Sequence, residues 1–501
     1  MQFRYKLLLY MKYSSHNLSL SVPGPNPLPV FGRAINTFRF TNDSIKYTHH
    51  LFQTYGPIVS LAFGGGTNLY SPLSNCPGTV FIYGPELIRQ VTTQDEIYYR
   101  YSLTGKFYGK RNLSARTKPL NYFGVGLFGE NSDQHRQHRR LLMPAFHKQR
   151  IESYRNNIVA ITQSVLDQMQ VNEHYDIAKI LKLLTMQVST KTLLGYDIGE
   201  KSNEINKLLR DCLNPNSLLI ALLPFDLPGL PYHRFFNMLA QFDHELRNLI
   251  MHKRHKGLDD GDILSMLIQA RDAESGVSLS EDELLGHTSA IFAAGYDTSS
   301  HALTWTLFLL SQHPHVAADL LDELENVLYG EAPTLEQLQQ LPFLEQVIKE
   351  SMRILPPIPW NVRVTAQPTE LGGYALPKGT EILMSVYHTH HMSEIYPQPE
   401  VFHPQRWQTI QPTVFEYNSF GSGQRICIGA AFAMMEMKII LAILLQRYRL
   451  QCIPSLKVDR QEFITLAPKY GMTMTVHKQD RQFHQGVGGI RGNVREMVKL
   501  T

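Results

Sequence analysis

A short glycine-rich stretch near the C-terminal end holds a cysteine in a setting that suits metal chemistry. It reads Phe420-Gly421-Ser422-Gly423-Gln424-Arg425-Ile426-Cys427-Ile428-Gly429, and an apolar run follows it. A following helix N-terminus and the loop amides would stabilise a Cys427 thiolate. Glycines such as Gly423 and Gly429 would let the backbone lie flat against a porphyrin. The pattern predicts a thiolate that binds a haem iron, with Arg425 near a propionate and Phe420 shielding the sulfur.

The spacing of this stretch, F-x-x-G-x-R-x-C-x-G, resembles the haem-binding loop of the cytochrome P-450 superfamily. A single buried cysteine is usually a small hydrophobic residue, but here all the motif positions are filled. Three further motifs, in the family's order, carry the same resemblance, which extends over residues 22–477.

An acid lies beside an alcohol, Asp297 and Thr298, in the middle of a long apolar segment. Ser280 begins a capping-box pattern that predicts a helix start, and Pro314 predicts the end of that helix. An acid inside an apolar helix is costly unless it is partnered or used. A threonine hydroxyl there can bond back to the backbone and loosen the helix locally.

The sequence around this pair, Ala294-Gly295-Tyr296-Asp297-Thr298-Ser299, resembles the A-G-x-D-T motif of the family. The resemblance implies that Asp297 and Thr298 are catalytic and deliver the protons of oxygen activation through an ordered water. It also implies that Ala294 and Gly295 lie at the haem, where the glycine leaves room. An acid–alcohol pair facing a solvent pocket is the alternative interpretation.

Further haem contacts are implied by two other segments. His135 and Arg139 are four residues apart, so they share one face of an expected helix. The family often has Trp-x-x-x-Arg at this place, with both side chains at a propionate, and His135 stands here for the tryptophan. A solvated basic helix that docks a redox partner is the alternative. Arg363, in an expected strand, matches another propionate ligand of the family.

A cluster of charges is expected to be structural. Glu350 and Arg353 resemble the E-x-x-R helix of the family, and Arg406 lies in a segment that resembles its P-x-R loop. Together they would form a desolvated triad that positions the loop of Cys427. Such a cluster adds little net stability, but removal of one member strands a buried charge.

Composition narrows the possible partners. Charged residues make up 18% of the chain and the net charge is only +4, which gives no argument for nucleic acid binding. The four cysteines show no C-x-x-C spacing, which argues against a disulfide framework or a zinc site and fits a reducing compartment.

Three regions are expected along the chain. Residues 1–21 form an extension whose apolar run is too short for a membrane anchor or a signal peptide. Residues 22–477 form the catalytic domain, and the glycine-rich, charged residues 478–501 a loosely ordered tail. We expect a cytoplasmic, monomeric enzyme whose contact with membranes is at most peripheral.

The resemblance implies a mainly α fold, a triangular helical array that encloses haem b beside a small β-rich subdomain. It implies a monooxygenase that uses O2 to hydroxylate or epoxidise a lipophilic molecule such as a fatty acid or terpenoid. Residues 217–231 would form an apolar lid, and residues 464–476 a hairpin whose tip enters the pocket. Electrons would come from NAD(P)H through a separate ferredoxin with its reductase, or a flavoprotein, because no such module is fused here.

Two other functions stay open at this point. A peroxide-driven or rearranging haem-thiolate enzyme would need no electron donor, but such relatives usually lose the acid–alcohol pair that Asp297 and Thr298 form here. A haem sensor or carrier would need no proton relay, and nothing in the chain resembles a signalling output domain.

Overall fold

A computed structural model describes residues 20–27, 32–101, 126–196, 199–213, 227–257, 260–272, 274–462 and 464–500. The chain divides into two compact units, which are described here one at a time. Unit 1 comprises Met1–Arg136, Pro359–Ile395 and Pro412–Ile426, and unit 2 comprises Gln137–Ile358, Tyr396–Gln411 and Cys427–Thr501. Most of the expected lid, residues 217–226, lies outside the described residues.

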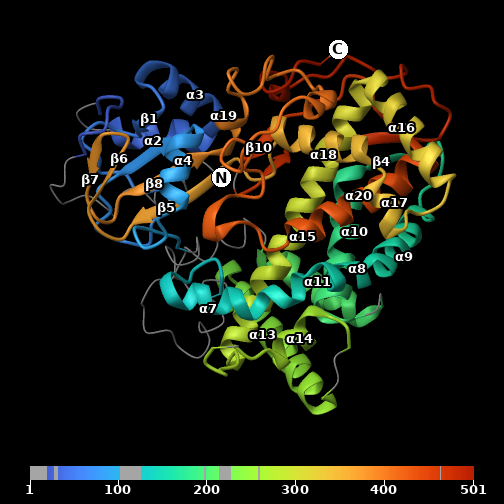
Figure 1. The fold of residues 1–501 in the computed structure, drawn as a ribbon, viewed down its shortest axis with the longest axis horizontal. Coiled ribbons are helices and arrows are strands. Elements are labelled where there is room, and N and C mark those ends of the chain that lie inside the picture. Colours follow the sequence, from blue (N-terminus) through green and yellow to red (C-terminus); the bar gives the residue numbers. More distant parts are fainter. Residues whose placement is uncertain are drawn as a thin grey trace. The chain divides into compact units, whose positions relative to one another are not determined.

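Unit 1 is the β-rich part that the resemblance implies (Figure 1). Its main sheet has five strands in the order β1-β2-β8-β5-β3, antiparallel except for the parallel pair β2–β8. The strands are β1 (Ile58–Ser60), β2 (Thr79–Ile82), β3 (Tyr98–Tyr99), β5 (Trp360–Thr365) and β8 (Glu381–Ser385), and a separate hairpin pairs β6 (Thr369–Leu371) with β7 (Tyr374–Leu376). The helical elements are α2 (Gly32–Asn42), α3 (Ser44–Tyr55), α4 (Pro85–Thr92), α19 (Val386–His390) and the 3-10 turn η4 (Gly423–Arg425).

Both faces of this sheet are buried, because its alternate side chains enter two different cores. Phe81 of β2 and Leu383 of β8 pack with Phe40 and Phe52 of the helices α2 and α3. Val80 and Ile82 of β2 belong to a second core with residues of α4 and the β6–β7 hairpin. Continuous apolar strands such as β2 are typical of a sheet covered on both faces.

Unit 2 is mainly helical, and α7 (Ser132–Leu142) crosses from unit 1 into it. Its other long helices are α9 (Arg155–Leu166), α10 (Ile177–Ser189), α11 (Glu200–Leu213), α13 (Pro231–Lys256), α15 (Glu281–Gln312), α16 (Pro314–Leu328), α18 (Pro342–Ile354) and α20 (Ala430–Arg447). Short helices are η1 (Met143–Phe146), α8 (Lys148–Ser153), η2 (Thr190–Leu194), α14 (Ile263–Gln269), α17 (Leu335–Gln339), η3 (Pro404–Gln408) and η5 (Asn493–Glu496). Its strands are β4 (His174–Asp176), β9 (Tyr448–Cys452), β10 (Arg460–Glu462), β11 (Leu466–Pro468) and β12 (Thr473–Lys478).

The helix α15 runs through unit 2, and α10 packs along it (Figure 1). Its start is the expected capping box: the Ser280 side chain accepts from the Glu283 backbone, and the Glu283 side chain accepts from Ser280. Its end is also as expected, since Pro314 opens the next helix and cannot continue α15. The local sequence therefore sets the length of this helix at both ends.

Two C-terminal segments differ from the sequence expectation. The terminal hairpin is formed by β10 and β11, whereas β12 joins a three-stranded sheet with β4 and β9. The segment after β12 is packed rather than loosely ordered, because Ile490, Val494, Met497 and Val498 are buried. These four apolar residues outweigh the surrounding glycines and charges that suggested a loose tail.

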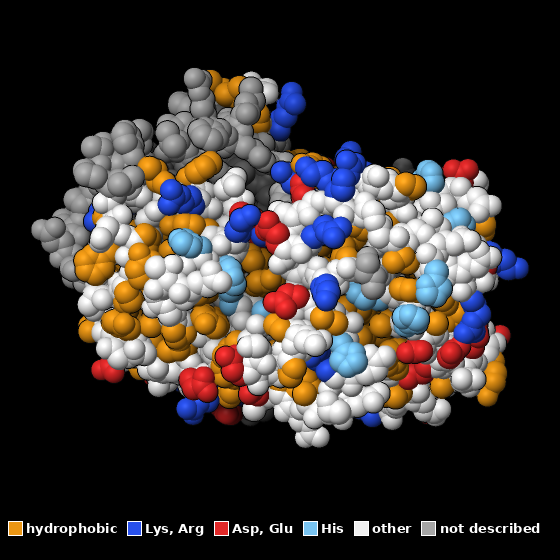
Figure 2. Space-filling model, turned by 90° about the horizontal axis from the view of Figure 1, so that it is seen from above, with side chains coloured by type: hydrophobic (Ala, Val, Ile, Leu, Met, Phe, Trp, Pro, Cys, Tyr) orange, Lys and Arg blue, Asp and Glu red, His pale blue; other side chains and the backbone are white. Residues whose placement is uncertain are grey.

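The surface in view carries both signs of charge. On the face that Figure 2 shows, acidic and basic side chains are interspersed with hydrophobic ones. No helix among the residues that the structure describes is both long enough and apolar enough to cross a bilayer.

Candidate active site

The acid–alcohol pair lies in the interior of α15. The Asp297 side chain is 25% exposed, and Thr298 is also less buried than the neighbouring core. The Thr298 hydroxyl donates to the carbonyl of Ala294, one turn earlier, at 2.7 Å. This back-bond was expected, and it gives that carbonyl a second donor within the helix. Because its hydrogen is engaged in this way, the Thr298 oxygen keeps lone pairs that can accept from a water molecule.

Asp297 is held by side chains from three places in unit 2. Lys182 of α10 donates to Oδ1 at 2.7 Å, and Thr465, in the turn between β10 and β11, donates to Oδ2 at 3.3 Å. Nδ1 of His301, one turn further along α15, lies 3.9 Å from Oδ2. The carboxylate therefore has partners on both oxygens.

These partners decide the charge of Asp297. Burial alone would raise its pKa, but the fields of His301 and Lys182 and the hydrogen bonds from Lys182 and Thr465 hold the pKa below its ordinary value. Burial also lowers the pKa of His301, so this imidazole is neutral near pH 7 and its field acts on Asp297 only at lower pH, where the imidazole is charged. Lys182 is therefore the cation that keeps Asp297 ionised.

The thiol of Cys427 is exposed, three residues before the first turn of the 18-residue helix α20. The positive end of a helix dipole favours a thiolate at such a position. The two cysteines that are buried differ from it, since burial raises the pKa of Cys212 to about 12 and that of Cys452 to about 11. Cys427 is thus the cysteine of unit 2 whose surroundings suit a metal ligand.

Two arginines expected at the haem are buried in unit 1. Nε of Arg363 makes no hydrogen bond within the described residues, although one of its other nitrogens donates to the Val362 carbonyl. Burial, followed by repulsion from Arg100 and Arg425, lowers the pKa of Arg363 to about 9, and Asp95 offsets this only in part. A buried cation in this state calls for an anion such as a haem propionate.

Arg425 is held mainly by protein groups of the same unit. Its guanidinium donates to the carbonyls of Leu127 and Glu130, at 3.0 and 2.6 Å, and to the side chain of Asn131 at 2.8 Å. Its Nε lies 3.5 Å from a carboxylate oxygen of Asp95. These contacts anchor the loop before Cys427, whereas the expected role of Arg425 at a propionate stays a prediction.

The other expected haem residues are placed as follows. His135 is buried on α7, whereas Arg139, one turn further on, is half-buried. Gly423 has a φ of +68°, and a Cβ there would lie 2.0 Å from the Thr92 carbonyl, so packing within unit 1 already requires glycine. Residues with intermediate exposure are Phe420, Ala294, Gly295 and Gly429.

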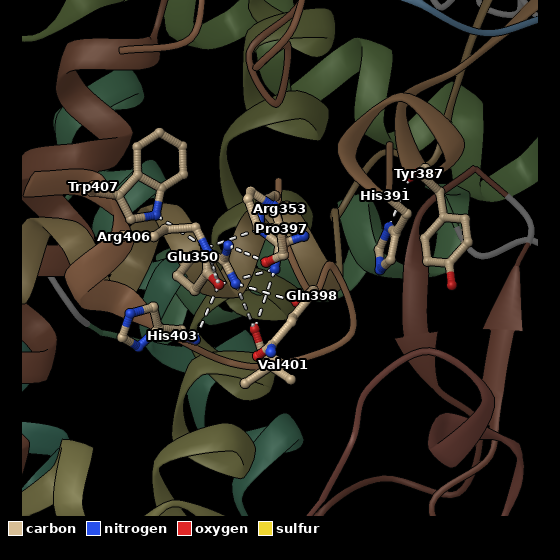
Figure 3. A network of polar contacts seen from close by, with 10 residues as sticks. All are labelled: Glu350, Arg353, Tyr387, His391, Pro397, Gln398, Val401, His403, Arg406 and Trp407. Carbon is tan, nitrogen blue, oxygen red and sulfur yellow. Dashed lines mark hydrogen bonds and ion pairs between the residues drawn. The ribbon is translucent and has the colours of Figure 1, made fainter. Parts of the chain in front are cut away.

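The expected charge triad is present in unit 2 and is more extensive than the sequence indicated (Figure 3). Glu350 is fully buried and accepts from Arg353 through two bonds of 2.9 Å and from Arg406 at 2.9 Å. The His403 amide and the Trp407 indole, at 3.1 Å each, complete its shell. This shell ties α18 to the segment of η3.

Sequence reasoning missed three polar residues near the acid–alcohol pair. Lys182 and Thr465 lie 115 and 168 residues from Asp297, and neither belongs to a motif. Glu436 of α20 is fully buried, and its pKa rises to about 8 because of burial, with Ser299 of α15 offsetting this slightly. A charge inside an apolar helix was the available signal for Glu436.

An exposed thiol before a helix and a partly buried acid–alcohol pair in another helix are both among the residues that the family resemblance singled out. The model of the family described as Cytochrome P450 matches residues 22–474 of the chain. The chain belongs to the cytochrome P450 family. Haem iron is accordingly the cofactor of this cytochrome P450 and O2 its co-substrate, and the protein is a monooxygenase.

Three known proteins illustrate the similarity. Cyclooctat-9-en-7-ol 5-monooxygenase of Streptomyces melanosporofaciens is 31% identical over 377 residues, which cover 74% of this chain and 80% of that protein. Pentalenene oxygenase of Streptomyces avermitilis is 29% identical over 448 residues, or 87% of this chain and 92% of that protein. The solved structure of retinoic acid-bound cyanobacterial CYP120A1 has a TM-score of 0.74 at 24% identity, covering 92% of this chain and all of that one.

The described residues fit the haem that the family binds. Within unit 2, the exposed thiol before α20 suits an iron ligand. Within unit 1, the buried guanidinium of Arg363, whose charge is only partly compensated, suits a carboxylate of the kind that haem carries.

Proposed function

We propose that this cytochrome P450 inserts one oxygen atom of O2 into a terpenoid-like hydrophobic substrate, by hydroxylation or epoxidation, with electrons from a separate redox protein. The observation that carries the proposal is the pair in α15: an ionised Asp297 held by Lys182, next to Thr298 with its hydroxyl bonded into the helix. A haem protein that only carried or sensed a ligand would not need such a pair.

The proposed ligand of the haem iron is Cys427, and Arg363 is the proposed partner of a propionate. Haem, when bound, supplies the oxygen chemistry, and a thiolate ligand favours cleavage of the O–O bond. Supporting roles at the haem are proposed for Arg425, Arg139, His135, Phe420, Gly423, Gly429, Ala294 and Gly295.

The proposed proton path uses Asp297 and Thr298. Asp297 reaches toward Lys182 and the β10–β11 turn, so it can exchange protons with the solvent side. The Thr298 oxygen can accept a hydrogen bond from a water that Asp297 also contacts, because the Thr298 proton is given to Ala294. The two side chains would then hand protons inward while the apolar part of α15 excludes bulk water.

The proposed substrate class rests on the relatives. Two bacterial relatives are named for cyclooctat-9-en-7-ol and pentalenene, and both are terpenoid oxygenases. The described end of the expected lid exposes Leu227 and Leu230, at 60% and 40%, which suits a hydrophobic ligand. A fatty acid would satisfy the same apolar surface and is the alternative substrate.

The proposed electron source is NAD(P)H, acting through a ferredoxin with its reductase or through a flavoprotein reductase. Members of the family generally draw electrons from such a partner. The acid–alcohol pair supports this source over hydrogen peroxide, because peroxide already carries the protons that Asp297 and Thr298 would deliver.

A labelling experiment tests the proposal. Cyclic terpenes, terpene alcohols and fatty acids are first screened for a substrate-induced shift of the haem absorption. Ligands that give a shift are then incubated with NADPH, a surrogate ferredoxin pair and 18O2. The proposal expects a product that carries one 18O atom and depends on the donor. Product formed equally well from unlabelled peroxide alone, with no donor-dependent turnover, contradicts it.

A further inference from the structure

One face of α10 contacts α15 at the acid–alcohol pair. The residues of this face are Lys182, Thr185 and Ser189, spaced by three and four positions, which brings them to the same side of the helix. Each of them meets a different part of the Ala294–Thr298 turn. Since the two helices share unit 2, these contacts are internal to one compact unit.

Thr185 connects the two helix backbones. Its hydroxyl lies 2.9 Å from the carbonyl oxygen of Tyr296, the residue before Asp297, and 3.0 Å from the Leu181 carbonyl of its own helix. The Lys182 carbonyl is a third acceptor at 3.3 Å, and the hydroxyl has one hydrogen to share among the three. When it is given to Tyr296, it fixes α15 against α10 immediately before the acid.

Ser189 and Gly295 set the distance between the helices at the same place. A Cβ built on Gly295 would lie 3.2 Å from the Ser189 hydroxyl, closer than nearly all side-chain contacts. The glycine therefore lets α10 approach this turn closely. Room for the haem and close helix packing are both reasons for a glycine here.

Lys182 acts on the acid itself. Its ammonium is 2.7 Å from Oδ1 of Asp297 and 5.4 Å from the centre of the Tyr296 ring. The Lys182 side chain is 38% exposed, so it joins the carboxylate to the solvent side. The other groups that face Asp297 among the described residues are Thr465 and the neutral His301.

We propose that α10 is part of the oxygen-activating site: Lys182 and Thr185 are positioning residues that hold the Asp297 carboxylate, and the turn before it, in the geometry for proton delivery. This inference rests on the proposed monooxygenase function. It adds two residues that act through Asp297 and the turn before it.

Lys182→Met tests the first residue. A group that transfers a proton contributes about 100-fold or more to a rate. Lys182 only positions such a group, Asp297, so its loss should lower the product per NADPH by less, roughly tenfold. Lys182→Arg should restore most of the coupling, because it keeps the positive charge near Oδ1. Lys179→Met is the matched control: Lys179 is on the same helix, 85% exposed, and pairs with Asp176 instead.

Two readouts separate positioning from damage to the fold. Turnover driven by hydrogen peroxide should be unchanged in Lys182→Met, because peroxide brings its own protons. In addition, Lys182→Met should lower the product per NADPH no further when Asp297→Asn is already present. The proposal is overturned if Lys182→Met is coupled as well as Lys179→Met, or if peroxide-driven and donor-driven turnover fall together.

A measurement without turnover covers the case in which no substrate is found. The carboxylate of Asp297 is followed by infrared titration, with Asp297→Asn identifying its band. Because Lys182 lowers the pKa of Asp297 and burial raises it, Lys182→Met should move this titration to higher pH. An unchanged titration refutes the proposal even if the enzyme is inactive, whereas a shift together with inactivity counts only against the proposed function.

Thr185 is tested by hydrogen exchange. Thr185→Val has nearly the same volume but lacks the hydroxyl, so amides of residues 295–299 should exchange faster, with lower coupling. Thr185→Ser keeps the donor and should behave as the parent protein. Exchange and coupling that are the same in both variants would remove Thr185 from the proposal.

Discussion

Glu436 of α20 and Ser299 of α15 face each other inside unit 2, with the carboxyl group fully buried. The serine follows Thr298 directly, so an acid from the helix after Cys427 approaches the turn that carries the acid–alcohol pair. Neither carboxylate oxygen of Glu436 makes a hydrogen bond of normal geometry within the described residues. The carboxyl is therefore protonated at neutral pH.

This burial predicts how stability depends on pH. The pKa of Glu436 is about 8 in the folded chain and about 4.5 when unfolded, so between these values only the folded state binds the proton. The free energy of unfolding should then fall as pH rises, by up to about 1.4 kcal/mol per pH unit from this group. Glu436→Gln should flatten that part of the profile, measured by urea unfolding from pH 5 to pH 8.

A second buried acid serves as the control. Glu381 accepts from the amides of Leu69 and Tyr70 and from the Thr79 hydroxyl, all within 2.9 Å. Glu381→Gln should destabilise the protein by about 2 kcal/mol or more, because an amide NH2 replaces one carboxylate oxygen and leaves a buried donor without its acceptor. If Glu436→Gln and Glu381→Gln changed the free energy of unfolding and its pH dependence equally, the two carboxyl groups would not differ in their surroundings as described.

The triad of Glu350, Arg353 and Arg406 predicts a large loss of stability when one of its charges is removed. Arg406→Leu leaves the Glu350 carboxylate buried with one cation fewer and should cost about 3–5 kcal/mol of stability. The control is Arg481→Leu, which breaks half-exposed pairs with Asp322 and Glu325 and should cost less than about 1 kcal/mol. Similar losses in thermal unfolding of both variants would show that the triad is not desolvated as its geometry indicates.

Thr298→Ala should uncouple electron use from product. Without the hydroxyl that donates to Ala294, no side-chain oxygen is left there to accept from the relay water, so reduced oxygen is released as peroxide. Thr298→Ser keeps the oxygen and should keep most of the coupling. Hydrogen peroxide and product are measured per NADPH consumed, and unchanged ratios in the alanine variant would exclude Thr298 from the relay.

Arg363→Met should make the apoprotein more stable but make the protein lose haem faster. The pKa of Arg363 falls to about 9 from 12.5, so at pH 7 the folded chain holds a charged group at a cost that the unfolded chain does not have. Its removal should stabilise the apoprotein against urea and speed haem transfer to apomyoglobin. The control is Arg460→Met, which should destabilise, because Arg460 is equally buried but bonded to Glu462 and Glu496. An apoprotein weakened by Arg363→Met would contradict this account.

The residues that sequence reasoning found are those with local or motif signals. Ser280 and Glu283 are three apart and form their capping box within one turn. The Glu350–Arg353 pair likewise lies within one turn, whereas Arg406 was reached only through the family resemblance. Short sequence separation makes such contacts predictable, since helical spacing alone brings the side chains together.

The residues that it missed depend on tertiary contacts. A lysine at position 182 on an amphipathic helix reads as a surface charge, and only the packing of α10 on α15 brings it to Asp297. The buried residues near Ile490 were concealed by glycines and charges around them. Spacing within one segment contains no information on which distant segment it will meet.

The central claim is that Cys427 binds the haem iron as a thiolate. The haem-loaded protein is reduced and exposed to carbon monoxide, with Cys452→Ala as a control that should behave as the parent. We predict an absorption band displaced far to long wavelength, as thiolate ligation requires, and its loss in Cys427→Ser. A folded, haem-loaded parent protein whose band is of the histidine type, or one that takes up no haem, would contradict the account.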